Sequence, residues 1–315
     1  MLGFAEGRIF DLHGCDSLPE PGIVWLDVER SANWRKQLPA CVDLPLHSRH
    51  ENDVLNQSHP PFFDKTQDYD LLILRAYDQS SDIDHPLTRP IVFILRGNLL
   101  VTVRDPSDDT FRELVERWQS GQLGAPTSIE SLLHRLCDAI VDAMLVNREP
   151  INDLLSDWQD RLLDPHDPFD DWRQLMRLRN QLRWQSGILE AQTTALEDWR
   201  EECQTELSQN LSIRFNDLEE HLRRVVSHVD QTQAAIDALV QIHFAANGQR
   251  TNQVMQFLAV ISAIFLPLNL LVGYFGMNFA DFAILQVSWA IDLVTVAMIS
   301  LVAGMLWMFR RRKWI

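Results

Sequence analysis

The chain has 315 residues and a formal net charge of −16, with 28 Lys and Arg side chains against 44 Asp and Glu. Apolar residues make up 46% of the chain, enough for a large buried core, so a disordered chain is excluded. Nucleic acid is excluded as a partner, because neutralising its phosphates needs clustered cations. These totals alone would suit a soluble acidic enzyme.

The charge is distributed unevenly along the chain. Residues 251–315 carry four basic side chains, at positions 310–313, against Asp281 and Asp292, a net charge of +2. Residues 1–250 therefore carry 24 basic and 42 acidic side chains, a net charge of −18. The last fifth of the chain thus differs in kind from the rest.

The N-terminal residues have neither the basic nor the apolar region of a secretory signal, so we expect the N-terminal part to lie in the cytoplasm. The four cysteines are far apart and form no CxxC pair, which is typical of reduced, buried thiols. They are Cys15, Cys41, Cys137 and Cys203.

Residues 1–124 have the pattern of a mixed α/β domain. Four β-rich apolar runs predict strands over 22–28, 70–77, 91–96 and 98–103. Gly97-Asn98 between the last two is a two-residue hairpin signal. We expect helices around 31–38, 48–57 and 108–119. Three histidines, His47, His50 and His59, could suggest a zinc site, but their place in this helix-and-turn run favours structural roles.

Beyond Gly121 the sequence predicts helices only. Thr127 to Glu130 has the pattern of a capping box, followed by an amphipathic helix to about Leu163. A Pro-containing breaker at 164–168 ends it, and a second helix is expected from about Asp170 to Trp199. A third helix starts near Ser208 and meets no proline until Pro267.

The third helix carries a heptad pattern, which predicts a long stalk packed against copies of itself. Residues with alternating spacings of four and three form this seam: Leu218, Leu222, Val225, Val229, Thr232, Ile236, Leu239 and His243. The chain has no internal repeat, so symmetry has to come from a homo-oligomer.

Two runs near the C-terminus are long enough to cross a lipid bilayer, which needs about 20 apolar residues. Residues 254–277 contain no charge, and residues 289–309 contain only Asp292. The alternative is a pair of buried core helices in a soluble protein. The basic residues after the second run and the absence of Lys and Arg between the runs predict that both termini are cytoplasmic. We therefore expect a multi-pass protein of the inner (plasma) membrane.

One face of the first span is polar. At 100° per residue, several polar or small side chains fall within a stripe that we predict to line a pore. Its residues are Asn252, Met255, Leu258, Ser262, Leu266, Asn269 and Gly273. The alternative is that Ser262 and Asn269 form hydrogen bonds between helices of a bundle.

Gly276, Met277 and Asn278 end this span, and here the chain resembles the CorA family of divalent metal-ion transporters, whose signature is Gly-Met-Asn after the first of two C-terminal spans. The similarity extends back through the segments 252–255 and 265–267. A run from His47 to Arg75 is similar to the family's N-terminal His … Glu-Asp-Val-Leu … Asp-Tyr … Leu-Arg pattern.

The resemblance implies a pentameric funnel made of an N-terminal α/β cytoplasmic domain, a long coiled stalk helix and two transmembrane helices, an α+β membrane protein overall. The corresponding parts are 1–124, 125–250 and 251–315. It also implies that Gly276, Met277 and Asn278 form the selectivity motif, with Asn278 holding a divalent cation through its hydration shell. Asn269 could form a second polar ring, and Met255 with Leu258 a hydrophobic constriction. No cofactor besides the transported cation is expected.

The identity of the cation is open between zinc and magnesium. Magnesium-type members follow Gly-Met-Asn with a Met-Pro-Glu turn, where this chain has Phe279-Ala-Asp281. The absence of that acidic turn favours the ZntB-like zinc branch, and a CorA-type magnesium, cobalt or nickel channel is the alternative. Neither span contains Cys or His, so soft ligands for dehydrated zinc are missing there.

Further carboxylates could handle cations. Asp281 and Asp292 could serve an ion entrance or proton coupling, and Asp217 could bind a regulatory cation on the stalk, as could Glu219, Glu220 and Asp230. A solvated helix face is the alternative for these stalk residues. An acidic vestibule would raise the local cation concentration.

A membrane-anchored sensor or scaffold without ion flux is the competing function. An enzyme is disfavoured, because the chain has no glycine-rich phosphate loop, nucleophile elbow or HExxH motif.

Overall fold

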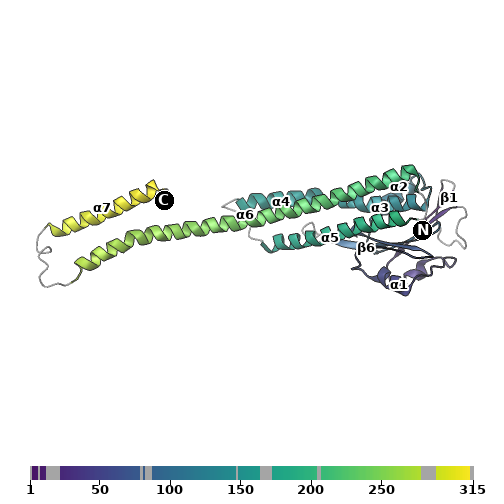
Figure 1. Cartoon of the computed structure of the whole chain (residues 1–315), viewed down its shortest axis with the longest axis horizontal. Coiled ribbons are helices and arrows are strands. Elements are labelled where there is room, and N and C mark those ends of the chain that lie inside the picture. Colours follow the sequence, from purple (N-terminus) through teal and green to yellow (C-terminus); the bar gives the residue numbers. More distant parts are fainter. Residues whose placement is uncertain are drawn as a thin grey trace. The chain divides into compact units, whose positions relative to one another are not determined.

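The computed structural model describes residues 2–5, 8–11, 22–78, 81, 87–146, 148–163, 172–203, 207–277 and 289–312 (Figure 1). They form two compact units, Met1–Leu239 and Val240–Ile315, each of which is described by itself. Helix α6, Gln209–Phe275, contributes to both units. The first unit contains the whole predicted α/β domain and most of the predicted helical region.

The first unit is built around a seven-stranded sheet with the order β2-β1-β3-β7-β6-β5-β4. Its strands are β1 Leu2–Ala5, β2 Arg8–Asp11, β3 Ile23–Glu29, β4 Phe62–Lys65, β5 Asp70–Tyr77, β6 Thr88–Arg96 and β7 Leu99–Arg104. β3 and β7 pair in parallel, and the other pairs are antiparallel. All four predicted strands are confirmed, whereas β1, β2 and β4 were not predicted.

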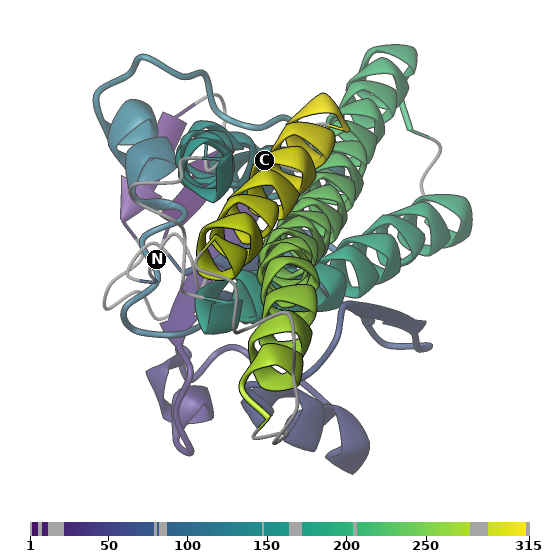
Figure 2. The ribbon, with the colours of Figure 1, turned by 90° about the vertical axis from the view of Figure 1, so that its left-hand side faces the viewer.

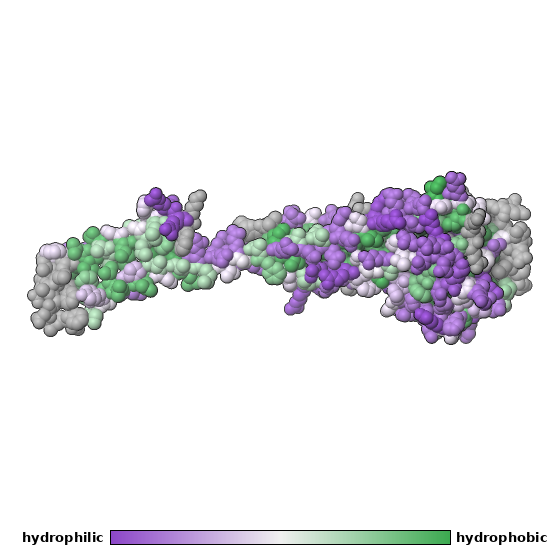
Figure 3. All heavy atoms as spheres, viewed as in Figure 1, coloured by the Kyte–Doolittle hydropathy of each residue, from purple (hydrophilic) through white to green (hydrophobic). Residues whose placement is uncertain are grey.

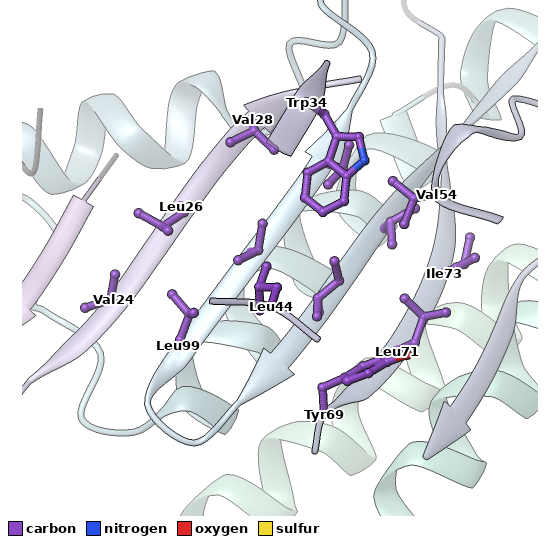
Figure 4. Close-up of a cluster of buried hydrophobic side chains, with 14 residues drawn as sticks. Val24, Leu26, Val28, Trp34, Leu44, Val54, Tyr69, Leu71, Ile73 and Leu99 are labelled. Atoms are coloured by element: carbon purple, nitrogen blue, oxygen red, sulfur yellow. The ribbon is translucent and has the colours of Figure 1, made fainter. Parts of the chain in front are cut away.

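Both faces of the central strands are buried, which explains their continuous apolar runs. Val24, Leu26 and Val28 alternate along β3 and belong to a core cluster with Leu71 and Ile73 of β5 (Figure 4). On the other face, helices α3 (Ile129–Val146) and α5 (Trp172–Glu202) contact β5. The sheet therefore lies inside the unit as a central layer.

The predicted hairpin at Gly97-Asn98 is confirmed. Arg96 pairs with Leu99 across the turn, and Gly97 has a φ of +57°, a left-handed conformation that glycine adopts without steric cost.

The short helices of the first unit lie where the sequence predicts them. They are a 3₁₀ helix at Trp34–Gln37, α1 at Ser48–Leu55 and α2 at Arg112–Gln119. His47 caps α1, because its Nδ1 accepts a hydrogen bond from the Arg49 N–H at 3.2 Å. His50 is buried between the Tyr69 hydroxyl at 2.7 Å and Asp64 at 2.9 Å. These contacts agree with the structural roles predicted for the histidines.

One detail of the helical region differs from the prediction. The Ser131 N–H donates to the Ser128 hydroxyl, so Ser128 caps α3 and the predicted cap, Thr127, lies one residue too early. Helices α3 and α4 (Arg148–Leu163) cover the helix expected to Leu163, and residue 147 between them lies outside the described residues.

The heptad seam of α6 is buried within the chain, so its predicted packing against copies of itself is wrong for residues 218–239. The seam residues from Leu218 to Leu239 are at most 4% exposed. The chain's own helices surround this part of α6. The Phe215 ring contacts His134 of α3 and Trp199 of α5, and His228 contacts Asn152 of α4 at 3.2 Å. Three neighbouring helices thus take the place of the expected copies.

The second unit consists of the C-terminal part of α6 and helix α7, Ala290–Arg311. Both helices are long and apolar enough to cross a membrane, and almost none of their apolar surface is buried. Leu266, Leu270 and Ile291 are each at least 68% exposed. Figure 3 shows hydrophobic side chains gathered along these two helices. The chain's own core therefore does not cover these apolar faces, as expected of two helices that cross a membrane.

Candidate ion pathway

The predicted pore-lining stripe lies on the part of α6 that belongs to the second unit. All seven of its residues, Asn252, Met255, Leu258, Ser262, Leu266, Asn269 and Gly273, are exposed in the single chain. Leu266 is 71% exposed and Met255 63%. The helix continues without a break through Pro267, so every residue of the stripe keeps its helical phase.

The opposite face of this helix is partly covered. Its half-buried and buried residues follow helical spacing: Gln256, Val260, Ala263, Ile264, Pro267, Leu268, Leu271 and Phe275. At 100° per residue this face is centred about 150° from the stripe. Helix α7 runs alongside the same part of α6 (Figures 1 and 2), and its own half-buried residues, such as Val294 and Met298, also share one face. The pairing of the two helices therefore leaves the polar stripe uncovered.

Gly276 ends α6 in a geometry that excludes a side chain. Its N–H donates to the Val272 carbonyl at 2.9 Å, and a Cβ at this position would lie 2.8 Å from that same oxygen. The Cβ would be attached to the backbone of Gly276 and the oxygen belongs to the backbone of Val272, so neither could move away without distorting the last turn of α6. This contact gives a physical reason for glycine at the first position of the Gly-Met-Asn motif. Gly273, by contrast, has open space where a Cβ would be.

The remaining residues of the predicted site are only partly described. Met277 follows the helix and is 52% exposed. Asn278 and Asp281 lie outside the described residues. Asp292 is exposed in the first turn of α7, where a carboxylate is favoured by the positive end of the helix dipole.

The predicted stalk carboxylates have partners within the first unit. Glu219 lies 2.8 Å from Arg200, Glu220 lies 2.8 Å from Arg224, and Asp230 accepts a hydrogen bond from Ser186. The side chain of Asp217 is 64% exposed and lies 3.6 Å from the Nε2 atom of His221. Because Asp217 is exposed and has no arginine partner among the described residues, a cation can reach its carboxylate.

A cluster that sequence reasoning missed lies next to Asp217. One ligand atom each of Asp138, Asp142 and His221 lie within 4.8 Å of one another. Burial and the neighbouring Asp138 raise the pKa of Asp142. The Nδ1 atom of His221 is buried and has no hydrogen-bond partner among the described residues. Two carboxylates and an imidazole are donors that suit Zn²⁺ and similar cations.

The sequence contains a weak signal for this cluster. Asp138 and Asp142 are four residues apart, as are Asp217 and His221, so each pair shares one helix face. Nothing in the spacing says that the two faces meet, because that depends on how α3 packs against α6.

Comparison with known proteins identifies related sequences. The chain matches the family described as CorA-like Mg2+ transporter protein over residues 20–311. It is 22% identical over 271 residues to the cobalt/magnesium transport protein CorA of Thermotoga maritima, covering 86% of this chain and 77% of that protein. It is 25% identical over 324 aligned positions to the zinc transport protein ZntB of Klebsiella pneumoniae, covering 98% of this chain and 93% of that protein.

Solved structures share the fold. The CorA magnesium transporter from Methanocaldococcus jannaschii superposes with a TM-score of 0.83 at 18% identity, covering 100% of this chain and 98% of that one. The ZntB cytoplasmic domain from Vibrio parahaemolyticus superposes with a TM-score of 0.64 at 14% identity, covering 79% of this chain and 98% of that one.

Proposed function

Since this chain belongs to the CorA-like Mg²⁺ transporter family, and is therefore a divalent metal-ion transporter, we propose that it moves Zn²⁺ along the uncovered stripe of α6. The observation that carries this proposal is the exposure of Asn252, Ser262 and Asn269 on the face turned away from α7. Amides and hydroxyls are costly against lipid, so such a face requires water or another protein surface.

Zinc is favoured over magnesium by two observations. The ZntB zinc transporter of Klebsiella pneumoniae aligns with 98% of this chain, and Asn278 is followed by Phe279-Ala-Asp281 in place of the Met-Pro-Glu turn of magnesium-type members. A magnesium channel is the second candidate, because the Thermotoga maritima relative is a cobalt/magnesium transporter.

A ring of Asn278 amides from several subunits would hold the cation through its water shell, since neither Cys nor His is present in the spans. Asn269 would give a second polar ring at a lower level. Met255 and Leu258 would form a constriction that closes by dewetting. Asp281 and Asp292 would supply carboxylates near the entrance or for proton coupling.

A ring requires more than one chain, so the proposal includes a homo-oligomer, which we take to be a pentamer. Each subunit would contribute its stripe to a common axis, with α7 at the periphery. Both termini would be cytoplasmic in the inner membrane, as the basic residues after the second span favour. Asp217 would bind a regulatory cation, a role supported by the nearby Asp138–Asp142–His221 cluster.

The test is ion flux through the purified full-length protein in liposomes loaded with Zn²⁺- or Mg²⁺-sensitive dyes, with and without a pH gradient. We expect a Zn²⁺ signal that Asn278→Ala abolishes in an assembled oligomer. Asn269→Leu should lower the rate about tenfold, because losing a contact of about 1.4 kcal/mol in the rate-limiting state has that effect. Asp217→Asn in the same assay tests the regulatory role.

Gln256→Leu is the matched control, because it removes an amide from the covered face of the same helix. Its rate should equal that of the wild type. Equal losses in Asn269→Leu and Gln256→Leu would contradict the assignment of the stripe. If no divalent cation gave a dye signal, the competing function of a scaffold without ion flux would be favoured. A signal for Mg²⁺ alone would show that the transported cation is magnesium and not zinc.

A further inference from the structure

A pocket of about 260 Å³ lies in the first unit, between the β4–β5 turn, the β6–β7 turn, the first turn of α3 and the end of α5. None of its lining residues belongs to the proposed ion pathway. Those that carry the argument are Asp68, Asp70, Arg96, Glu130 and Trp199.

Glu130 is the buried carboxylate of this pocket. It lies in the first turn of α3 and is 7% exposed, and its carboxylate forms no hydrogen bond or ion pair in the part of the chain that the structure describes. It also lines the neighbouring pocket that contains Arg135 and Arg214, but neither arginine comes within ion-pair distance of it. Burying a charge is costly unless a group of opposite charge pairs with it, so Glu130 requires a cationic partner.

Trp199 adds an unpaired donor to the same lining. Its side chain is 1% exposed, and its indole Nε1–H has no hydrogen-bond partner among the described residues. Buried polar groups of proteins are nearly always hydrogen-bonded, either to protein or to a bound molecule. The pocket thus combines a buried acceptor and a buried donor without protein partners, which indicates that a polar molecule occupies it.

The side-chain charges of the lining are mainly negative. Asp68 is exposed and Asp70 is half-buried, and neither forms an ion pair among the residues described. Burial raises the pKa of Asp70 despite the nearby Lys65. Arg96 is the only basic side chain among the described lining residues, and it donates to the Asp43 carbonyl. Three acidic side chains against one basic side chain leave a net charge of −2, which favours a cation.

The two helix ends at the pocket do not change this balance. The start of α3 carries about half a positive charge and the end of α5 about half a negative charge, so their effects offset each other. An ammonium group already lies at the end of α5, where Lys65 Nζ donates to the Glu202 carbonyl. The side chains of the lining therefore decide which ligand is bound.

The spacing of the carboxylates favours an organic cation over a single metal ion. Among the described residues, only one set of three His, Cys, Asp or Glu side chains has ligand atoms within 4.8 Å of one another, and it lies outside this pocket. Asp68, Asp70 and Glu130 are therefore too far apart to coordinate one ion together. An organic cation with several N–H donors can reach carboxylates at such a spacing.

We propose that this pocket binds a small organic cation with a primary ammonium group. The ammonium would donate charge-assisted hydrogen bonds to Glu130 and to one of the two aspartates. The indole N–H of Trp199 would donate to an oxygen of the ligand or of a water bound with it. The volume of about 260 Å³ is below the range of about 300–1,000 Å³ for drug-sized ligands, so the ligand is small. A diamine and an amino alcohol share this chemistry.

Isothermal titration of the full-length protein in a neutral detergent tests this site. The buffer is phosphate with EDTA and without Tris, because Tris is itself a primary amine. The titrants are putrescine, ethanolamine and butanediol. We expect at least one of the two amines to bind and the neutral diol not to bind. Glu130→Gln keeps the size of the side chain and removes its charge, so it should weaken amine binding about tenfold or more, as loss of a charge-assisted hydrogen bond predicts.

Glu113→Gln is the matched control. Glu113 also lies in the first turn of a helix, α2, but it is exposed and does not line the pocket. Equal affinities of Glu130→Gln and Glu113→Gln would overturn the proposal, because the amines would then bind the acidic surface in general. If Glu130→Gln fails to fold, Asp68→Asn on the exposed turn is the second variant, and it should weaken binding as well.

The choice of amine distinguishes the possible ligands. Binding of both amines supports a site for one ammonium group, binding of putrescine alone supports a site for a dication, and binding of ethanolamine alone supports a ligand oxygen that accepts from Trp199. The proposal is overturned if neither amine binds, or if the diol binds as tightly as the amines. Because EDTA removes metal ions, these outcomes do not depend on ion transport.

Discussion

Two buried arginines in the first unit show how a charged residue can serve as a structural support. Arg75 donates to the carbonyls of His59, Gln57 and Thr88, and Arg30 donates to those of Asn56 and Pro90. Burial and the neighbouring Arg30 lower the pKa of Arg75 to about 10. The guanidinium groups thereby satisfy loop carbonyls between α1 and β6 that would otherwise be buried without partners.

Tyr77 gives a pH-dependent prediction at the same scale. Its hydroxyl donates to Gln185 at 3.2 Å, and burial raises its pKa to about 12. An unfolded tyrosine has a pKa of about 10, so the folded state holds the proton more tightly. The stability that follows is fully present below about pH 10 and is lost as the pH rises toward about 12. Phenolate absorbance against pH should show a late-titrating group that Tyr77→Phe removes, and an unchanged titration curve would contradict this.

Gly276→Ala should distort the last turn of α6. The added Cβ would lie 2.8 Å from the Val272 carbonyl oxygen, so the last turn has to shift and Met277 moves with it. We expect transport in liposomes to fall below about a tenth of the wild-type rate while the first unit stays folded, since a barrier increase of about 1.4 kcal/mol is tenfold. Gly304→Ala on α7 is the control, because nothing lies within 4 Å of the added methyl group. Wild-type transport by Gly276→Ala would show that the contact relaxes freely.

At the scale of elements, the interior of the first unit depends on the seam of α6. Leu222 is fully buried in it, whereas Ile213 on the same helix is 61% exposed. Leu222→Ala should lower the free energy of unfolding by about 2–5 kcal/mol, and Ile213→Ala should change it little. Denaturant unfolding followed by far-UV circular dichroism measures both. If Leu222→Ala lost the oligomer without losing stability, the result would contradict burial of the seam within the chain and favour its packing against other subunits.

How much of these elements the sequence could predict depends on what each pattern encodes. The continuous apolar runs of β5 and β6 identify them as central strands, because both of their faces are buried. β4 consists of only Phe62–Lys65 after two prolines, and four half-buried residues give no clear alternation. The heptad pattern predicts the correct helix and the correct buried face. It could not predict which helices cover that face, because a heptad pattern is the same whether the covering helix belongs to the same chain or to another.

The candidate site also has a part that the sequence predicts and a part that it does not. The stripe from Asn252 to Gly273 is a property of one helix, so helical geometry is enough to predict it. Its residues are exposed, and their lining of a pore stays a prediction. The cluster of Asp138, Asp142 and His221 joins two helices that are far apart in the sequence. Only the packing of the first unit brings these three side chains together, so no sequence motif could have predicted the cluster.

At the scale of the whole molecule, acidity and hydrophobicity are segregated as the sequence predicts. Residues 1–250 carry a net charge of −18 and include the entire first unit, while the exposed apolar residues concentrate on α7 and the end of α6. An acidic first unit attracts cations and a hydrophobic second unit requires lipid, so each unit is suited to a different solvent.

The unbroken course of α6 has a consequence for how the chain tolerates insertions. Every residue of a continuous helix is locked in phase with the others, so one residue added near Gly248 would turn the stripe by about 100° relative to the seam, whereas seven added residues would turn it by only about 20°. Liposome flux should therefore fail with one inserted alanine and largely survive with seven. The number of residues between the seam and the stripe therefore sets the angle between them along α6. Only insertions close to a whole number of helical turns keep that angle.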